Sequence, residues 1–143
     1  MTASRLGLLA GILTSAGKEI PWADHLGGVE IIRRPSGAST SFENLYQAGR
    51  RVQRLLSVAE PVSMSDLPGG WHDAPIVHLG PVAHEITGEF GRLFPGALLG
   101  LTAQGFLRTW GDGSVVQPGR WSGDDALLDS CDVVFFSEED LRG

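Results

Sequence analysis

The chain has 143 residues, 42% of them hydrophobic and 20% charged, and a formal net charge of -6. This length suits one domain with a buried core, and the composition excludes a disordered or fibrous protein. The acidic balance argues against nucleic acid as a partner, because a phosphate-binding face needs clustered lysine and arginine.

Cysteine use and the N-terminus bear on the compartment. Cys131 is the only cysteine, so no intramolecular disulfide or cysteine metal site can form, which fits a reducing, cytoplasmic compartment. The apolar stretch 6–13 is interrupted by Gly7 and Gly11 and is too short to cross a bilayer, so we expect no membrane association. The same residues have a rough signal-peptide outline, and a secreted protein cleaved near Gly17 stays open as an alternative.

The N-terminal part of the chain predicts strands. Residues 7–15 are mostly apolar, and a run of this length does not distinguish a strand from a helix. Residues 29–60 contain three runs that predict antiparallel strands, with turns at 35–38 and 47–50.

The strand predicted over 40–47 mixes aromatic, amide and acidic side chains. One face carries Phe42, Asn44 and Tyr46, and the opposite face carries Glu43. The one basic cluster of the chain follows this strand and is typical of a solvated hairpin tip. Its members are Arg50, Arg51 and Arg54.

Three short apolar runs, at 75–80, 97–102 and 132–137, are typical of buried parallel strands. Between the first two, apolar residues recur at helical spacing and predict a helix within 82–94. The whole predicts an α/β core interrupted by a small antiparallel flap.

The last third of the chain predicts a hairpin and a helix. Residues 105–118 contain a Gly-Asp-Gly turn between two short runs, which predicts a hairpin. Ser122 followed by Asp125 is a capping signal for a helix through Leu127 and Leu128.

Polar residues and glycines follow the predicted parallel strands, at 14–19, 80–85, 102–105 and 137–140. Ligands of open α/β sheets lie beyond the carboxyl ends of the strands, so we expect the site at this edge.

Two groups of side chains invite a metal interpretation. The first group is His72, His78 and His84, which recur at intervals of six without a pair on one helical face, so we expect no direct metal ligand. His84 and the adjacent Glu85 remain possible ligand contacts. The acids at 138–140 fit two interpretations equally well. They could form the first turn of a helix, or they could hold Mg²⁺ beside a phosphate.

The order of these pieces resembles the central part of a ribokinase-like (PfkB-type) carbohydrate kinase. The resemblance extends over nearly the whole chain and lies in "TSFENLYQAGRRVQRLLSVAEPVSMSDLP", "APIVHLGPV", "FPGALLGLTAQGFLR" and "DVVFFSEEDL". It implies an α/β fold, namely a partial ribokinase-like parallel sheet with flanking helices and an inserted antiparallel β lid. Residues 1–143 would then be one partial domain, with 29–60 as the lid.

The same resemblance implies a function. Enzymes of this family transfer the γ-phosphoryl group of ATP, with Mg²⁺, to a hydroxyl of a small sugar, polyol or nucleoside beneath the lid. Their lids can pair between subunits, so a homodimer through the lid is expected. The residues that the resemblance places at the substrate are Phe42, Asn44 and Tyr46, alternatively Glu43, with Gly80 and Gln104 lining the pocket.

The chain also departs from the family. Ser137 and Asp140 stand where the family has an N-x-x-E motif that organises Mg²⁺ and phosphate, and the usual Asp after the preceding strand is replaced near Thr102. The early Gly-Gly substrate motif is missing from its place, and so is the G-A-G-D stretch with the catalytic Asp. We therefore expect a fragment or truncated relative of an ATP-dependent sugar kinase, inactive as this chain alone and without a catalytic residue. The alternative is a non-catalytic sugar-binding or dimerisation module.

Overall fold

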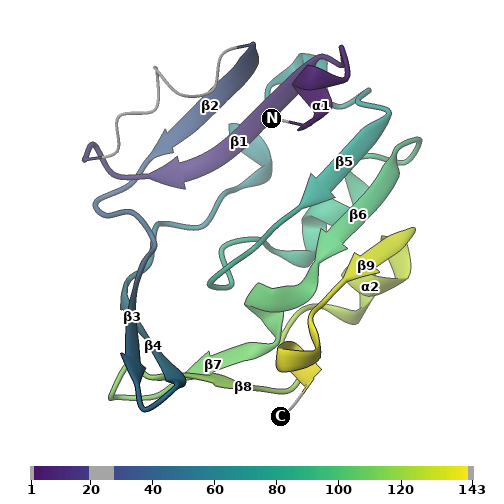
Figure 1. Cartoon of the computed structure of the whole chain (residues 1–143). Coiled ribbons are helices and arrows are strands. Elements are labelled where there is room, and N and C mark those ends of the chain that lie inside the picture. The colour runs from purple at the N-terminus through teal and green to yellow at the C-terminus, as the bar shows by residue number, and fades with distance from the viewer. Residues whose placement is uncertain (1, 20–27, 142–143) are drawn as a thin grey trace.

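The computed structural model describes residues 2–19 and 28–141, with only the backbone described at 139 and 141 (Figure 1). Five of the described strands are parallel. The first pair is β1 (Ala10–Ala16) with β2 (Val29–Pro35). The other three form a sheet in the order β5 (Ile76–Leu79), β6 (Leu98–Thr102) and β9 (Val133–Phe135).

Two hairpins complete the strands. The first joins β3 (Ser41–Gln47) to β4 (Arg50–Ser57), and the second joins β7 (Arg108–Trp110) to β8 (Val116–Pro118). Both are antiparallel, as their turn residues predict. Ala48 and Gly49 form the first turn with φ angles of 48° and 77°, a left-handed conformation that glycine adopts without strain.

The helices are short. The α-helices are α1 (Thr2–Arg5) and α2 (Asp125–Ser130). The 3-10 turns are η1 (Met64–Asp66), η2 (Gly69–Trp71), η3 (Gly88–Arg92), η4 (Ala103–Phe106) and η5 (Glu138–Leu141). No helix among the described residues is long and apolar enough to cross a membrane.

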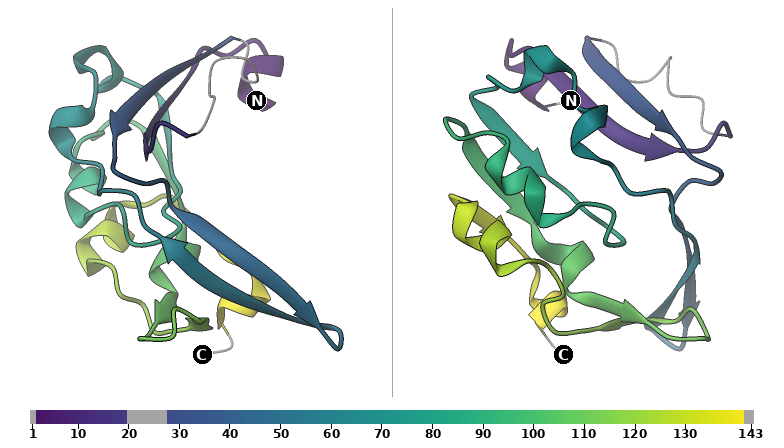
Figure 2. Two further views of the ribbon diagram at one scale, coloured as in Figure 1. Left: turned by 90° about the vertical axis from the view of Figure 1, so that its left-hand side faces the viewer. Right: turned by 180° about the vertical axis from the view of Figure 1, so that it is seen from behind.

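The core lies on one face of the β5–β6–β9 sheet. Figure 2 shows most of the helical segments on this side, while α1 and the projecting β3–β4 hairpin lie on the other side. Burial removes apolar surface from water, and the cluster draws its residues from the sheet, η3, η4 and α2. Its buried members are Val62, Leu79, Phe90, Phe94, Leu99, Leu101, Phe106 and Leu127.

The opposite face of this sheet is exposed in the described part of the chain. The register places Ile76 beside Leu98, and Phe135 beside Thr102, on that face. Ile76 is 61% exposed, Leu98 is 51% exposed and Phe135 is 52% exposed. Parallel sheets are usually covered on both faces, so this apolar surface is unusual for a parallel sheet.

Strand β2 corrects one prediction. Residues 29–35 pair in parallel with β1 instead of joining an antiparallel flap, and the pairing extends from Ala10 opposite Val29 to Ala16 opposite Pro35. The apolar side chains of Ile31 and Ile32 fit a core strand as well as a hairpin, so the pattern could not distinguish the two pairings. The antiparallel flap starts at β3. The undecided run 7–15 also resolves as a strand, β1.

The helix predicted within 82–94 is also wrong, because only the 3-10 turn η3 forms there. His84 has φ of 62°, outside the helical region, and the carboxylate of Glu85 accepts hydrogen bonds from the backbone N–H groups of Val82 and Ala83. Glycines at 88 and 91 further weaken a helix. The predicted helix at 127–128 is confirmed as α2, although Asp124 rather than Ser122 caps it, accepting from the Ala126 N–H at 2.9 Å.

Candidate functional site

The carboxyl ends of β5, β6 and β9 meet at one edge, where the two hairpins and η5 also lie (Figure 1). Two loops of this edge are in close contact, since the Gly105 N–H donates to the Pro81 carbonyl at 3.1 Å. A Cβ added at Gly105 would lie 2.5 Å from that oxygen, so the approach requires glycine. The predicted pocket residues Gly80 and Gln104 each adjoin this contact.

The β3–β4 hairpin is attached to the second hairpin through β4. Arg54 forms a bridge with Val115, and the Leu55 N–H donates to the Ser114 carbonyl at 2.8 Å. Leu55 is buried, which fixes the base of the hairpin, whereas Tyr46 near the tip is 76% exposed. The β3–β4 and β7–β8 hairpins are thus joined to each other through β4.

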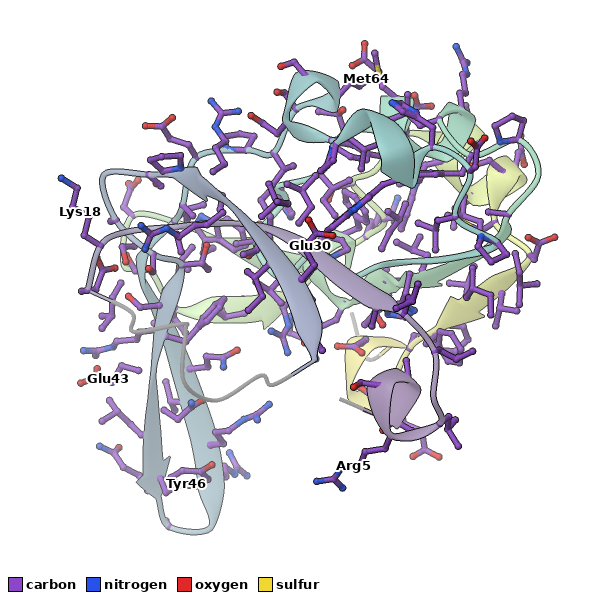
Figure 3. All side chains as sticks on the ribbon, turned by 90° about the horizontal axis from the view of Figure 1, so that it is seen from above. Arg5, Lys18, Glu30, Glu43, Tyr46 and Met64 are labelled. Atoms are coloured by element: carbon purple, nitrogen blue, oxygen red, sulfur yellow. The ribbon has the colours of Figure 1, made fainter. Side chains whose placement is uncertain are left out.

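The two faces of the β3–β4 hairpin differ in what they border. Asn44 lies opposite Gln53 and accepts a hydrogen bond from its amide nitrogen at 3.0 Å, and Tyr46 lies opposite Arg51 on the same face. Glu43 lies opposite Arg54 on the other face. Figure 3 shows Glu43 on the side of the hairpin that points away from the rest of the molecule.

A groove of about 500 Å³ lies between β4, the β7–β8 hairpin and η5. Three arginines and one aspartate are among its lining residues. Of the hairpin residues that line it, Gln53 and Arg51 share the face of Asn44 and Tyr46, whereas Arg50, opposite Gln47 at the tip, belongs to the other face. The lining residues are Arg50, Arg51, Gln53, Leu107, Arg108, Val116, Gln117, Pro118 and Asp140.

Asp140 is the carboxylate of the groove, and it is only 6% exposed. Its Oδ2 accepts from the Ser137 N–H at 2.9 Å and from the Ser137 hydroxyl at 2.7 Å. Burial alone would raise the pKa of Asp140, but the hydrogen bonds from Ser137 and the nearby Arg108 and Gln104 outweigh it and hold the pKa below its ordinary value. Asp140 is thus an ionised capping residue of η5.

His78 lies at the end of β5, on the exposed face of the sheet. Its Nε2 is 2.9 Å from the Thr102 hydroxyl, and its ring centroid is 5.7 Å from that of Phe135. These contacts link the ends of all three strands of the sheet. Thr102, near which the resemblance expects an Asp, is therefore hydrogen-bonded to His78.

His84 lies at the loop after β5 and contacts the second hairpin. Its Nε2 is 3.0 Å from the Arg108 carbonyl and 3.3 Å from the Ser122 hydroxyl, and its ring stands 4.8 Å from that of Trp110. Glu85 binds backbone N–H groups of its own loop. Both residues have structural partners that account for them without a ligand.

The fit of Mg²⁺ can be tested on the acids at 138–140. Mg²⁺ is held through carboxylate oxygens, and Asp140 gives Oδ2 to both donors of Ser137. Among the described residues, no three histidine, cysteine or acidic side chains gather as a metal site would require. The described side chains do not fit a direct Mg²⁺ site, and the hydrogen bonds of Asp140 agree with the capping interpretation.

The structure brings some predicted residues together and adds others. Asn44, through Gln53, and Gln104, through Asp140, adjoin the groove. The sequence interpretation missed the groove's arginines, because the cluster at 50–54 matches a solvated hairpin tip. Only the folded hairpin shows that β4 faces Arg108 across the groove.

Comparisons with known proteins give a consistent fold. No protein-family model matches the chain, and a search of curated proteins found no significant relative. A sulfate complex of a pyrophosphate-dependent kinase in the ribokinase family matches 93% of the chain at 24% identity, with a TM-score of 0.72. A pyrophosphate-dependent kinase in the ribokinase family complexed with a pyrophosphate analogue and myo-inositol matches 93% at 26% identity, also at 0.72.

The chain covers 49% and 48% of these two chains, so it spans about half their length. The resemblance deduced from the sequence is confirmed at the level of the fold. This chain has the fold of ribokinase-family kinases over about half of the length of those proteins.

Proposed function

We propose that this chain supplies the lid and part of the sheet edge of a phosphotransferase that acts on a small polyol or sugar. The observation that carries the proposal is the groove between β4, the β7–β8 hairpin and η5, whose volume of about 500 Å³ suits a small molecule. It lies at the carboxyl ends of the parallel strands, where α/β sheets bind ligands.

The groove offers polar groups for an acceptor with several hydroxyls. Amides both donate and accept hydrogen bonds, as a hydroxyl requires, and Gln53 and Gln117 line the groove. Asn44, paired to Gln53, and Tyr46 lie on the same hairpin face and would complete the acceptor contacts. One structural neighbour was solved with myo-inositol, which supports a polyol acceptor.

The donor in this proposal is a phosphoanhydride. The resemblance implies ATP with Mg²⁺, and both structural neighbours are described as pyrophosphate-dependent, so pyrophosphate joins ATP as a candidate. Guanidinium groups bind phosphate oxygens through paired hydrogen bonds, and Arg108 lines the groove. No described residue is assigned to Mg²⁺.

The chain's own residues bind and orient the reactants in this proposal. A general base must accept a proton near neutral pH, and Asp140, with its lowered pKa and its hydrogen bonds from Ser137, is a weak base. Phosphoryl transfer depends on the positioning of the reactants and on stabilisation of the charge on the transferring group, and the groove residues supply only part of these two contributions. We expect binding by this chain without measurable turnover.

Isothermal titration of the 143-residue chain with myo-inositol, with and without pyrophosphate, tests the proposal. We expect binding that Asn44→Ala weakens about tenfold, as loss of a hydrogen bond predicts. Glu43→Ala, on the opposite face of the same strand, is the matched control and should bind as the wild type does. Absence of binding with a folded chain, judged by circular dichroism, would overturn the proposal, whereas polyol-dependent release of phosphate would contradict the expected lack of turnover.

The homodimer through the lid also stays a proposal. Strand β3 has β4 as its one ladder partner among the described residues, so its other edge can pair with a second copy. Sedimentation equilibrium checks this: a dimer that Phe42→Pro disrupts would support pairing through β3, and a monomer at high concentration would refute it.

A further inference from the structure

The parallel strands of this chain form two sheets that no ladder joins. Among the described residues, β1 pairs with β2 alone and β5 pairs with β6 alone, so each of these strands has one free edge, an edge without a ladder partner. Figure 1 and the right-hand view of Figure 2 show β2, β1, β5, β6 and β9 following one another in this order. The arrows of β1 and β5 point the same way in Figure 1, so the two free edges face each other in parallel.

The core connects the two sheets although no ladder does. Leu13 of β1 packs against the cluster that contains Leu79 of β5. The ring of Trp71, which precedes β5, lies where a Cβ on Gly11 of β1 would be. Paired strands are about 4.8 Å apart, and β1 and β5 lie too far from each other to pair directly. Two parallel strands that share a core without pairing have the arrangement of strands that a third strand separates.

The free edge of β1 can be assigned to particular residues. Residues of a parallel strand turn their N–H and C=O groups to alternate sides. The Ser36 N–H donates to the Ala16 carbonyl at 3.1 Å, which places the backbone groups of Ala16 on the side of β2. By alternation, those of Gly11, Leu13 and Ser15 point to the free edge. The Ser15 hydroxyl is also buried without a hydrogen-bond partner among the described residues, and buried polar atoms are nearly always hydrogen-bonded.

The free edge of β5 follows from the same alternation. The Leu98 N–H donates to the Pro75 carbonyl at 2.9 Å, so Pro75 turns towards β6. The backbone groups of Ile76 and His78 therefore point away from β6. Backbone groups on a strand edge are a template for pairing with another segment. The free edges of β1 and β5 thus offer donors and acceptors to one strand from both sides.

We propose that this chain binds a partner polypeptide that inserts one extended apolar segment between β1 and β5, parallel to both, and so joins the two sheets. A strand inside a parallel sheet is covered on both faces, so its side chains are apolar throughout. The partner carries the part of the fold that this chain does not include, since the chain spans about half the length of the solved kinases it matches. A second copy could supply the segment only by withdrawing a strand from its own ladders. The groove plays no part in this inference, which therefore stands or fails separately from the proposed function.

Hydrogen exchange of the whole chain, followed by NMR, tests the inference with a synthetic heptapeptide of valines and isoleucines flanked by lysines. We expect a saturating amount of this peptide to slow exchange of the Leu13 and Ile76 N–H groups about tenfold or more, because both become hydrogen-bonded. The same peptide with a central proline lacks a donor and should not slow them. Unchanged exchange with the first peptide would overturn the inference. Equal slowing along β3, whose outer edge is also free, would overturn it too by showing unselective pairing.

Two further arms determine the direction and the source of the strand. A nitroxide on the N-terminus of the peptide should broaden the amide signals of Gly11 and Ile76, at the starts of the two strands, and spare those of Ser15 and His78. Broadening at Ser15 and His78 alone would overturn parallel insertion. Without peptide, exchange at Leu13 and Ile76 should not depend on protein concentration. Slowing at high concentration, together with a dimer in sedimentation equilibrium, would assign the strand to a second copy and overturn the choice of partner.

A pair of variants separates strand insertion from docking on the sheet face. Ile76 on β5 and Leu98 on β6 are neighbours on the exposed face, 61% and 51% exposed, so lysine should be tolerated at both, as circular dichroism can check. Ile76→Lys places a charge on the strand that receives the segment and should weaken peptide binding about tenfold. Leu98→Lys makes a similar change one strand further away and should leave binding within about twofold. Equal weakening by both variants would mean that the peptide lies on the face of the sheet, which contradicts insertion at the edges.

Discussion

Two turns of this protein have the same sequence form and the same geometry but different surroundings. In the first, the N–H and the hydroxyl of Ser63 donate to Asp66 Oδ2 at 2.8 Å and 2.7 Å. In the second, the same two groups of Ser137 donate to Asp140 Oδ2 at 2.9 Å and 2.7 Å. Both turns begin a 3-10 segment, η1 and η5, as serine and aspartate do at helix starts.

The arginine beside each turn makes the difference. Arg34, at the end of β2, donates to Asp66 at 3.0 Å and to the Pro61 carbonyl at 2.7 Å, so the first turn anchors β2 to the segment that follows the hairpin. The second turn has Arg108 beside it and lines the groove. The turn itself is thus a structural device, and only its position beside the groove connects the second copy with ligand binding.

Asp66→Ala should have the largest effect on stability. It removes the acceptor of two Ser63 donors and the partner of Arg34, so we expect a loss of about 2 to 3 kcal/mol in the free energy of unfolding. Urea denaturation measures this. Asp73→Ala, an exposed aspartate in the loop after η2, is the control and should change stability by less than about 0.5 kcal/mol. A loss as small as the control's would show that the first turn does not anchor β2.

Acid should weaken both turns. Hydrogen bonds from Ser63 and Ser137, with the nearby arginines, outweigh burial and lower the pKa of Asp66 and of Asp140 in the folded protein. The unfolded chain therefore binds more protons in this range, and the stability is complete above the ordinary value of about 3.9 and is lost as pH falls through the lowered values. Urea midpoints between pH 6 and pH 2 check this, and Asp66→Asn should reduce the acid dependence. An unchanged dependence in that variant would assign the acid sensitivity elsewhere.

Much of this fold could be predicted from the sequence where the local pattern and the tertiary contacts agree. The runs at 76–79, 98–102 and 133–135 are short and apolar, and all three became parallel strands. Failures occurred where one pattern suits two structures. The apolar side chains of β2 fit a core strand and a hairpin strand equally, and only its pairing with β1 decides between them.

The candidate site was less predictable, because it depends on distant segments. The hairpin face with Asn44 follows from strand alternation alone, but its contact with the groove requires β4 to face β8 and η5. The arginine cluster at 50–54 was visible in the sequence, yet charge at a turn is usually solvated. Arg108, 54 positions beyond Arg54, gave no local signal that it would join the same surface.

Exchanging the two arginines for lysine sharpens the comparison. In Arg34→Lys a single ammonium group replaces a guanidinium whose Nη1 reaches Asp66 and Pro61 and whose Nη2 reaches Glu60, so we expect a stability loss of about 1 kcal/mol and unchanged binding of inorganic phosphate. Arg108→Lys should instead weaken phosphate binding about fivefold, since an ammonium group cannot pair with two phosphate oxygens. Thermal denaturation and phosphate titration of both variants measure the two effects. If Arg34→Lys weakened phosphate binding as much, the two turns would not be functionally separate.

Asp140→Asn should have the smallest effect and separates two roles of this side chain. The amide oxygen still accepts from Ser137, so η5 should keep its cap, while removal of one negative charge from the groove should strengthen inorganic phosphate binding about threefold. Asp66→Asn removes the same charge from the other turn and should leave the affinity unchanged. The gain should shrink at high salt because screening weakens the repulsion that Asp140 exerts. Weaker phosphate binding in Asp140→Asn would contradict this and would mean that the carboxylate favours binding of the anion, for example through a cation that both contact. The second turn would then differ from the first in chemistry as well as in position.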